Sequence, residues 1–261
     1  MADIDFGAFD LVIFDWAGTM VDFGCRAPVE ALGAAFAQKG VDLDEAMARA
    51  DMGKAKRDHV TAILARPEII TLWTAAQGRP PGGADIDGLM QALGPLMTQA
   101  AEAAAELIPG ALETVESLRK AGLKIGSSTG YTRAMMAPVL ARAAAQGYAP
   151  DHVVCAGETP HGRPSPLMIY KACAELGVWP LSRVIKVDDA EAGIEEGLAA
   201  GCFTIAVAAS GNAVGLSRAA FEALEPAERS ARVGAAAERL RAAGAQLVID
   251  TVADLVPMLP G

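Results

Sequence analysis

The sequence predicts an α/β protein with a doubly wound, Rossmann-like parallel sheet and an all-helical segment inserted after the first strand. Strand and helix patterns alternate from residue 104 onward, which is typical of a parallel sheet with helices on both faces. Residues 23–103, in contrast, carry helical patterns and no convincing strand. We therefore expect an α/β core domain made of residues 1–22 and 104–261, and a helical cap domain made of residues 23–103.

The length and the net charge of the chain limit the classes of molecule that it is expected to bind. The chain has 261 residues, enough for one large domain or two modest ones with a substantial core. Its net charge of −10 argues against a nucleic-acid-binding protein and against attraction to an anionic membrane. A small anionic molecule remains a candidate ligand, because a metal ion or a local group of Lys and Arg side chains can override the overall sign.

Three further features favour a soluble, cytoplasmic protein. The four cysteines show no CxxC spacing, which argues against a zinc site or a disulfide framework and favours reduced thiols. The acidic N-terminus lacks the basic and apolar regions of a signal peptide. No apolar run reaches the length of a membrane span.

The first strand is expected at residues 11–14, where four apolar residues follow one another without a polar break. That pattern is typical of a parallel strand buried on both faces. The strand ends on Asp15, and Ala17-Gly18-Thr19 turn the chain. Ligands of open α/β sheets bind at the carboxyl ends of the strands, so Asp15 is a candidate site residue. A capping Asp in an ordinary strand–helix loop is the alternative.

The inserted segment shows a succession of helical patterns. We expect helices at 29–39, 42–64, 68–76 and 86–107, with a Gly/Pro-rich loop at 78–85. Within the second of these, Met52, Lys56, His59 and Ile63 recur at spacings of four, three and four. Such residues share one face of a helix.

After residue 107 the remaining elements alternate in type. Pro109-Gly110 opens a helix, and a solvent-facing amphipathic helical region without assigned function covers 222–243. The other strands are expected at 124–128, 153–155, 184–187, 203–208 and 246–250, with helices at 166–176, 193–200 and the C-terminus.

Polar groups stand at or just past several expected strand ends. Besides Asp15 these are the segment 127–131, Arg163 and the pair Asp188-Asp189. Each alone has an ordinary interpretation as a helix cap, a surface ion pair or a turn residue. Together they suit phosphoryl chemistry: carboxylates bind Mg²⁺, hydroxyl and amide donors bind an anion, and a cation neutralises it. In that setting Asp15 can act as a nucleophile and form an aspartyl-phosphate.

Several motifs resemble those of a known family. FDWAGT (14–19), IGSSTGYT (125–132) and the segment starting KVDD (186–189) resemble the nucleophile, Ser/Thr and acidic motifs of the haloacid dehalogenase superfamily. Three more narrow the match: MGxxKxxH, GRPSP and SGNxVGLS, at 52–59, 162–166 and 210–217. With all motifs in family order from about residue 10 to 218, the chain is similar to the phosphonoacetaldehyde hydrolases, or phosphonatases.

Two positions distinguish this family from the phosphatases of the superfamily. Most of those phosphatases carry a general-acid Asp two residues after the nucleophile, where this chain has Ala17. A phosphonate C–P bond has no bridging oxygen to protonate, so an acid there would have no task. Lys56 could be a lysine whose stem packs on apolar surface while its amine reaches water. Under a cap, however, a partly desolvated amine has a lowered pKa and can attack an aldehyde.

The resemblance implies a reaction and a set of roles. The reaction is Mg²⁺-dependent hydrolysis of phosphonoacetaldehyde to acetaldehyde and phosphate, through a Schiff base on Lys56. The metal ligands it implies are Asp15, the backbone carbonyl of Ala17, and Asp189. Thr129 and the Gly130 amide hold the phosphonyl oxygens, and Arg163 supports the transferring group.

The resemblance also implies neighbours of the Schiff base and an assembly. Residues flanking the imine are Cys25, Met52, His59 and Tyr131. Their ordinary interpretations are a buried thiol, a core methionine, a histidine with satisfied hydrogen bonds and a packing tyrosine. A homodimer formed through the cap helices is implied as well, and the apolar helix at 29–37 is compatible with it.

The chain departs from the family pattern at a few positions. Ala190 stands where a Thr is common, and Gly193 where some relatives carry another Asp, so water or Asp188 would have to complete the metal site. Two other functions remain as alternatives: a phosphate monoester phosphatase of the same superfamily, which Ala17 disfavours, and a non-catalytic binding protein, which the joint presence of the site residues disfavours.

Overall fold

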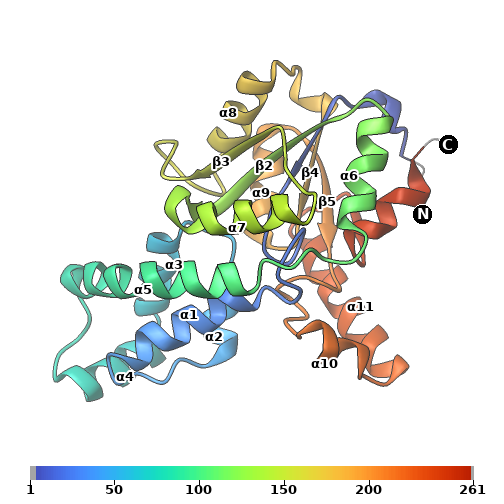
Figure 1. The fold of residues 1–261 in the computed structure, drawn as a ribbon. Helices are drawn as coiled ribbons and strands as arrows, with labels where there is room; N and C mark the ends of the chain where they lie inside the picture. Colours follow the sequence, from blue (N-terminus) through green and yellow to red (C-terminus); the bar gives the residue numbers. More distant parts are fainter. Residues whose placement is uncertain (1–3, 260–261) are drawn as a thin grey trace.

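The computed structural model describes residues 4–259 and contains one six-stranded parallel sheet (Figure 1). The strand order is β3-β2-β1-β4-β5-β6. Because successive strands are added first on one side of β1 and then on the other, the chain changes direction at β1. That change creates the crevice where such sheets bind ligands. The strands are β1 (Leu11–Phe14), β2 (Lys124–Thr132), β3 (His152–Ala156), β4 (Val184–Asp188), β5 (Phe203–Val207) and β6 (Leu247–Ile249).

Helices cover both faces of the sheet, which confirms the predicted doubly wound class. Along β1, Val12 and Phe14 belong to the largest apolar cluster, whereas Leu11 and Ile13 belong to a second cluster with α8. Alternate side chains of one strand therefore enter two cores, which explains the unbroken apolar run. The covering helices are α6 (Ala111–Lys120), α7 (Arg133–Ala145), α8 (Leu167–Leu176), α9 (Glu191–Ala200) and α11 (Pro226–Ala242). The short helix α10 (Arg218–Glu222) precedes α11 and lies away from the sheet (Figure 1).

Residues 23–103, here called the helical insert, contain helices and no strand, as predicted. Figure 1 shows them gathered beside the sheet, at its carboxyl edge, where α5 packs on α1 and also contacts α7. Phe36 and Trp73 meet edge to face within the insert, with ring centroids 6.2 Å apart, and both belong to the same apolar cluster as Val12 and Phe14 of β1. The insert helices are α1 (Arg26–Ala37), α2 (Glu45–Arg49), α3 (Lys56–Leu64), α4 (Pro67–Gln77) and α5 (Gly83–Ala103).

The expectation of one continuous helix over 42–64 is wrong. The structure has two short helices, α2 and α3, separated by a turn in which Asp51 and Gly53 adopt left-handed backbone conformations, with φ of 63° and 88°. Such conformations interrupt an α-helix. Met52 therefore lies in this turn and does not share a helix face with Lys56, although the two side chains still meet.

Other boundaries also differ from the predicted ones. Strand β2 continues to Thr132, so Thr129 lies within the strand and Thr132 caps α7. Helix α5 starts inside the predicted loop, at Gly83, and ends earlier than predicted, at Ala103. The C-terminal helix is a 3₁₀ segment, Val252–Met258. Within residues 4–259 no helix combines the length and the apolarity needed to cross a bilayer.

Candidate active site

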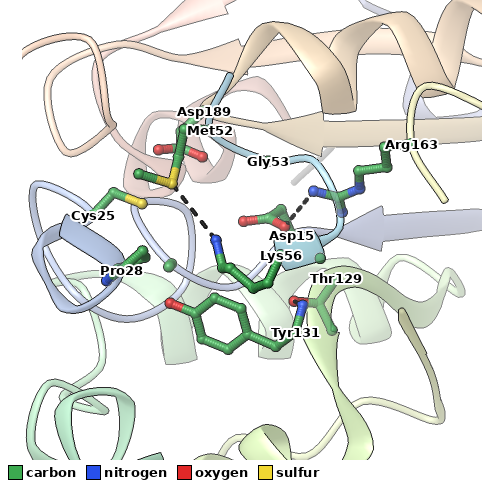
Figure 2. Close-up of a pocket in the computed structure, with 12 residues that line it drawn as sticks. Asp15, Cys25, Pro28, Met52, Gly53, Lys56, Thr129, Tyr131, Arg163 and Asp189 are labelled. Atoms are coloured by element: carbon green, nitrogen blue, oxygen red, sulfur yellow. Dashed lines mark hydrogen bonds and ion pairs between the residues drawn. The ribbon is translucent and has the colours of Figure 1, made fainter. Parts of the chain in front are cut away.

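A pocket with about 290 Å³ of empty space lies where the carboxyl ends of β1, β2 and β4 meet the insert (Figure 2). The structure brings ten of the eleven candidate residues to this pocket and leaves only His59 outside the lining. Pro28 and Gly53 also line it, although no role was predicted for either residue. The full lining is Asp15, Ala17, Cys25, Pro28, Met52, Gly53, Lys56, Thr129, Gly130, Tyr131, Arg163 and Asp189.

Three buried carboxylates meet at one side of the pocket. Asp15, Asp188 and Asp189 each offer an oxygen, and these oxygens lie within 4.8 Å of one another. Asp15 follows β1 directly, and its amide donates to the carbonyl of Val187 at 3.0 Å, which keeps the ends of β1 and β4 together. Burial, and then the charge of Asp188, raise the pKa of Asp15 to about 6. Burial and its two acidic neighbours raise the pKa of Asp189 well above its usual range. A bound cation would relieve this repulsion.

Arg163 connects these carboxylates to the interior. Its Nη1 donates to Asp15 Oδ1 at 2.8 Å and lies 3.3 Å from Asp188 Oδ2, while Nε donates to Glu196 Oε2 at 2.9 Å. Its Nη2 donates to the backbone carbonyl of Ser128 at 2.6 Å. Three nearby carboxylates raise the pKa of Arg163, so the guanidinium stays charged although it is buried.

Lys186, Glu196 and Ser128 extend this network and were not assigned roles from the sequence. Lys186 Nζ lies 2.8 Å from Asp188 Oδ2 and donates to Ser128 Oγ at 3.0 Å. Ser128 Oγ in turn donates to Glu196 Oε2 at 3.0 Å. Lys186 interrupts the apolar strand β4, and Lys is seldom fully buried without a partner. A lysine within this apolar strand was therefore the feature of the sequence that could have indicated a buried ionic network.

The position of the Asp188 side chain explains why residue 193 is a glycine. A Cβ built on Gly193 would lie 1.9 Å from Asp188 Oδ2, so no larger residue fits while this carboxylate holds its position. The amide of Ala190 donates to Asp188 Oδ1 at 3.1 Å and helps to hold it there. Asp188 therefore occupies the space that a side chain at position 193 would need.

Lys56 lies opposite the carboxylates in much less polar surroundings. Its Nζ is 3.9 Å from the Met52 sulfur and 5.4 Å from the centroid of the Tyr131 ring (Figure 2). Among residues 4–259, no carboxylate oxygen lies within 4.0 Å of this amine. The side chain is 3% exposed, and burial lowers the pKa of Lys56 to about 8. A useful fraction of the amine is therefore neutral near pH 7 to 8.

The other groups near Lys56 are neutral. Burial raises the pKa values of Cys25 and Tyr131 well above their usual ranges, so the thiol and the phenol keep their protons. His59 is fully buried on α3, and burial followed by the charge of Lys56 lowers the pKa of His59 to about 3. Its imidazole is neutral and lies behind the pocket lining.

An irregularity in β2 places Thr129, Gly130 and Tyr131 at the pocket. Thr129 pairs with Cys155 and Thr132 with Ala156, so Gly130 and Tyr131 are two extra residues in β2. A bulge of this kind re-aims side chains at the end of a strand. The Tyr131 amide donates to Thr129 Oγ1 at 3.2 Å. A Cβ on Gly130 would lie only 2.8 Å from the Lys54 carbonyl oxygen, so a glycine is needed for the insert to approach the strand.

Comparison with known proteins agrees with this geometry. The family model described as haloacid dehalogenase-like hydrolase matches residues 9–201, and the chain therefore belongs to this class of hydrolases. The phosphonoacetaldehyde hydrolases of Paraburkholderia phytofirmans and Paraburkholderia xenovorans are 48% and 47% identical to it, each over 95% of this chain and 93% of the relative. A crystal structure of a phosphonoacetaldehyde hydrolase-like protein from Oleispira antarctica has a TM-score of 0.94 and 41% identity, covering 98% of this chain and 94% of that one. Within its class, the chain belongs to the phosphonoacetaldehyde hydrolase family, as its motifs predict.

Proposed function

We propose that this enzyme hydrolyses the C–P bond of phosphonoacetaldehyde to give acetaldehyde and phosphate. One observation carries the proposal: a buried lysine with a lowered pKa faces the same small pocket as a nucleophile-type aspartate. An amine and a carboxylate on opposite sides match a substrate with an aldehyde at one end and a phosphonate at the other. Ala17 agrees, because this reaction requires no acid at that position.

The helical insert, residues 23–103, acts in this proposal as a cap domain over an α/β core of residues 1–22 and 104–261. The turn at 52–55 supports this role, because it sits directly over the strand ends. Gly53 approaches the core closely enough that a Cβ on it would lie 3.1 Å from the Ala190 side chain. Closure of such a cap excludes water from the reacting groups.

Mg²⁺ is the proposed cofactor, and the residues present fit it. Asp15, Asp189 and the backbone carbonyl of Ala17 would hold the ion, and these hard oxygen donors suit it. Burial and mutual repulsion raise the pKa values of both aspartates, and a bound cation would favour their charged forms. When bound, Mg²⁺ would neutralise charge on the phosphonyl oxygens.

The first chemical step belongs to Lys56. The neutral amine attacks the aldehyde carbon, and loss of water with uptake of one proton gives a protonated imine between the Lys56 nitrogen and the substrate carbon. Met52, Cys25 and Tyr131 keep this amine in a neutral environment, and the buried imidazole of His59 lies behind it. The imine then serves as the electron acceptor for the bond that must break.

Asp15 performs the second step. A carboxylate oxygen of Asp15 attacks phosphorus, the C–P bond breaks, and its electron pair passes to the imine, which becomes an enamine. The Thr129 hydroxyl and the Gly130 amide donate to the phosphonyl oxygens, and Arg163 holds Asp15 in place. Protonation and hydrolysis of the enamine release acetaldehyde and free Lys56. A second water hydrolyses the aspartyl-phosphate, so one water is consumed overall.

Borohydride trapping tests this mechanism. With phosphonoacetaldehyde and borohydride, the wild-type protein should be reduced to a stable secondary amine at Lys56, located by peptide mass spectrometry. Lys54→Met is a matched control, because Lys54 is two residues away and pairs with Asp51 at 2.5 Å, and its trapping should be unchanged. Phosphate release without any trapping at Lys56 would refute the Schiff base. Turnover of an aryl phosphate unaffected by Lys56→Ala would favour a monoester phosphatase.

Assembly and location remain predictions. The family resemblance predicts a homodimer through the helices of the insert, and analytical ultracentrifugation tests it. The unpaired cysteines Cys25, Cys155, Cys173 and Cys202 are all buried, which agrees with a reducing cytoplasm but is not specific to it.

A further inference from the structure

The motif at 210–217 has no task in the mechanism above, yet it connects the insert to the carboxylates. On the insert side the connection is Arg49, the last residue of α2, whose side chain is 13% exposed. Its Nη1 donates to the Gly24 carbonyl at 2.9 Å and to Asn212 Oδ1 at 3.1 Å. Its Nη2 donates to the Gly215 carbonyl at 2.7 Å. One guanidinium thus binds both the start of the insert and the loop after β5.

The loop after β5 also donates a hydrogen bond to the backbone of Arg49. Asn212 Nδ2 donates to the Arg49 carbonyl at 3.2 Å, so this pair is joined by two hydrogen bonds of opposite direction. Gly215 has a φ of 70°, and a Cβ on it would lie 2.7 Å from the guanidinium carbon. The loop is therefore shaped to receive the flat face of an arginine.

The other end of the loop reaches the candidate metal ligand. The Asn212 amide donates to Asp189 Oδ2 at 2.7 Å, and a Cβ on Gly211 would lie 2.8 Å from the Asp189 side chain. Ser210 Oγ donates to the Gly18 carbonyl at 2.8 Å, in the turn that follows Asp15. Movement of this loop would therefore displace the carboxylate of Asp189.

We propose that Arg49 and Asn212 form a latch that joins cap closure to the orientation of Asp189, an inference that rests on the proposed function. The contacts of Arg49 with Asn212 and Gly215 cross from the insert to the α/β part, so they must break whenever the insert swings away. Their acceptors are neutral oxygens, which make weaker bonds than a carboxylate and permit repeated release. Arg49 and Asn212 are positioning residues and touch no substrate.

The latch makes a quantitative prediction about metal binding. Arg49→Met removes the guanidinium bonds to Asn212 and Gly215, and Asn212→Ala removes both side-chain bonds of Asn212, so the two variants share the loss of the bond between Nη1 and Oδ1. The backbone amide that bonds Asp189 remains in both. Each variant should weaken Mg²⁺ binding, measured by isothermal titration calorimetry, by about tenfold. The double variant should lose less than the product of the two single effects, because both substitutions remove the same bond between Arg49 and Asn212. Arg49→Lys should restore part of the affinity.

Controls separate a latch from general damage. Arg79→Met removes an insert arginine that pairs with Asp85 inside the insert, at 2.6 Å, and should leave Mg²⁺ affinity unchanged. Thermal unfolding identifies any variant that fails to fold, and Asn212→Ser then provides a milder change. In steady-state assays the latch variants should show a Mg²⁺ requirement shifted to higher concentration, with kcat recovered at saturating metal.

Two results would overturn the latch. One is Mg²⁺ affinity in Arg49→Met within about twofold of wild type, well below the smallest coupling expected. The other is additivity, with the double variant losing the product of the two single effects. Failure of the proposed function is distinguishable, since it would appear in the wild type as missing phosphate release or missing trapping at Lys56, whereas calorimetry requires no substrate.

Discussion

Two buried cations face each other across the pocket, and their surroundings differ. Arg163 lies among Asp15, Asp188 and Glu196, with Nη1 near the first two carboxylates and Nε near the third. Lys56 lies among a thioether, a thiol and an aromatic ring, and no carboxylate within the described chain is close enough to pair with it. Burial is nearly complete at both side chains, so burial alone does not decide the charge of a buried base.

The difference teaches how one pocket supports two kinds of chemistry. Paired carboxylates keep Arg163 charged and hold the anionic end of the site in a fixed geometry. Burial, which no paired carboxylate offsets, lowers the pKa of Lys56 to about 8 and makes it a potential nucleophile. If the two sides act separately, substitutions on one side should leave the function of the other side intact.

The largest effect should come from separating the two chemical steps. Asp15→Asn removes the proposed phosphoryl acceptor but leaves the Lys56 side of the pocket intact. Phosphate release from phosphonoacetaldehyde should fall by about 10⁴-fold or more, as expected when a nucleophile is lost. Trapping of the aldehyde at Lys56 with borohydride should persist. Loss of both activities together would show that the two sides do not work independently.

Removal of the charged side chain should change the free energy of unfolding differently at Arg163 and at Lys56. Arg163→Met leaves buried carboxylates without their partner and should lower the free energy of unfolding by about 3–5 kcal/mol. Lys56→Met removes a buried amine that lacks a carboxylate partner and should leave this free energy unchanged or raise it. Urea titration of the two variants measures both. Equal destabilisation by the two substitutions would contradict the contrast between them.

The pH dependence of Lys56 should be visible in stability as well. Its pKa is about 8 in the folded protein and near 10.5 when unfolded, so the folded state binds fewer protons between these values. Stability contributed by this group therefore rises as pH increases from 8 toward 10, by about 3 kcal/mol in total. Any advantage of Lys56→Met over wild type should shrink over that window. An advantage independent of pH would mean that Lys56 titrates normally.

Much of this arrangement could be predicted from the sequence. The apolar run before Asp15, the alternation after residue 104 and the strand-free insert were sufficient for the sheet and for the position of the first carboxylate. Local patterns carry these features, because a strand buried on both faces or an amphipathic helix shows itself over a few residues. The motif resemblance then selected ten residues that line a single pocket.

The remaining features depend on contacts between distant segments. The roles of Lys186 and Glu196 arise only when β4 and α9 bring them to Arg163, and no spacing along the chain expresses that pairing. The periodicity that predicted a helix face through Met52 missed the left-handed turn at Asp51 and Gly53. Likewise, the extra residues in β2 become evident only from its register with β3.

Met52→Leu should have the smallest effect and tests the finest detail of the comparison. The substitution keeps volume and apolar character, so stability should change by less than about 1.5 kcal/mol. It replaces the sulfur 3.9 Å from the Lys56 amine with carbon, which removes a polarisable neighbour of the ammonium form. The pKa of Lys56 should therefore fall slightly below that of wild type. The measurement is the pH dependence of cyanoborohydride trapping with acetaldehyde, whose midpoint reports this pKa without any step at phosphorus. A midpoint that moves to higher pH would mean that the Met52 sulfur does not favour the charged form of Lys56. The residues around Lys56 would then act on its pKa only as apolar surroundings that disfavour the ammonium form.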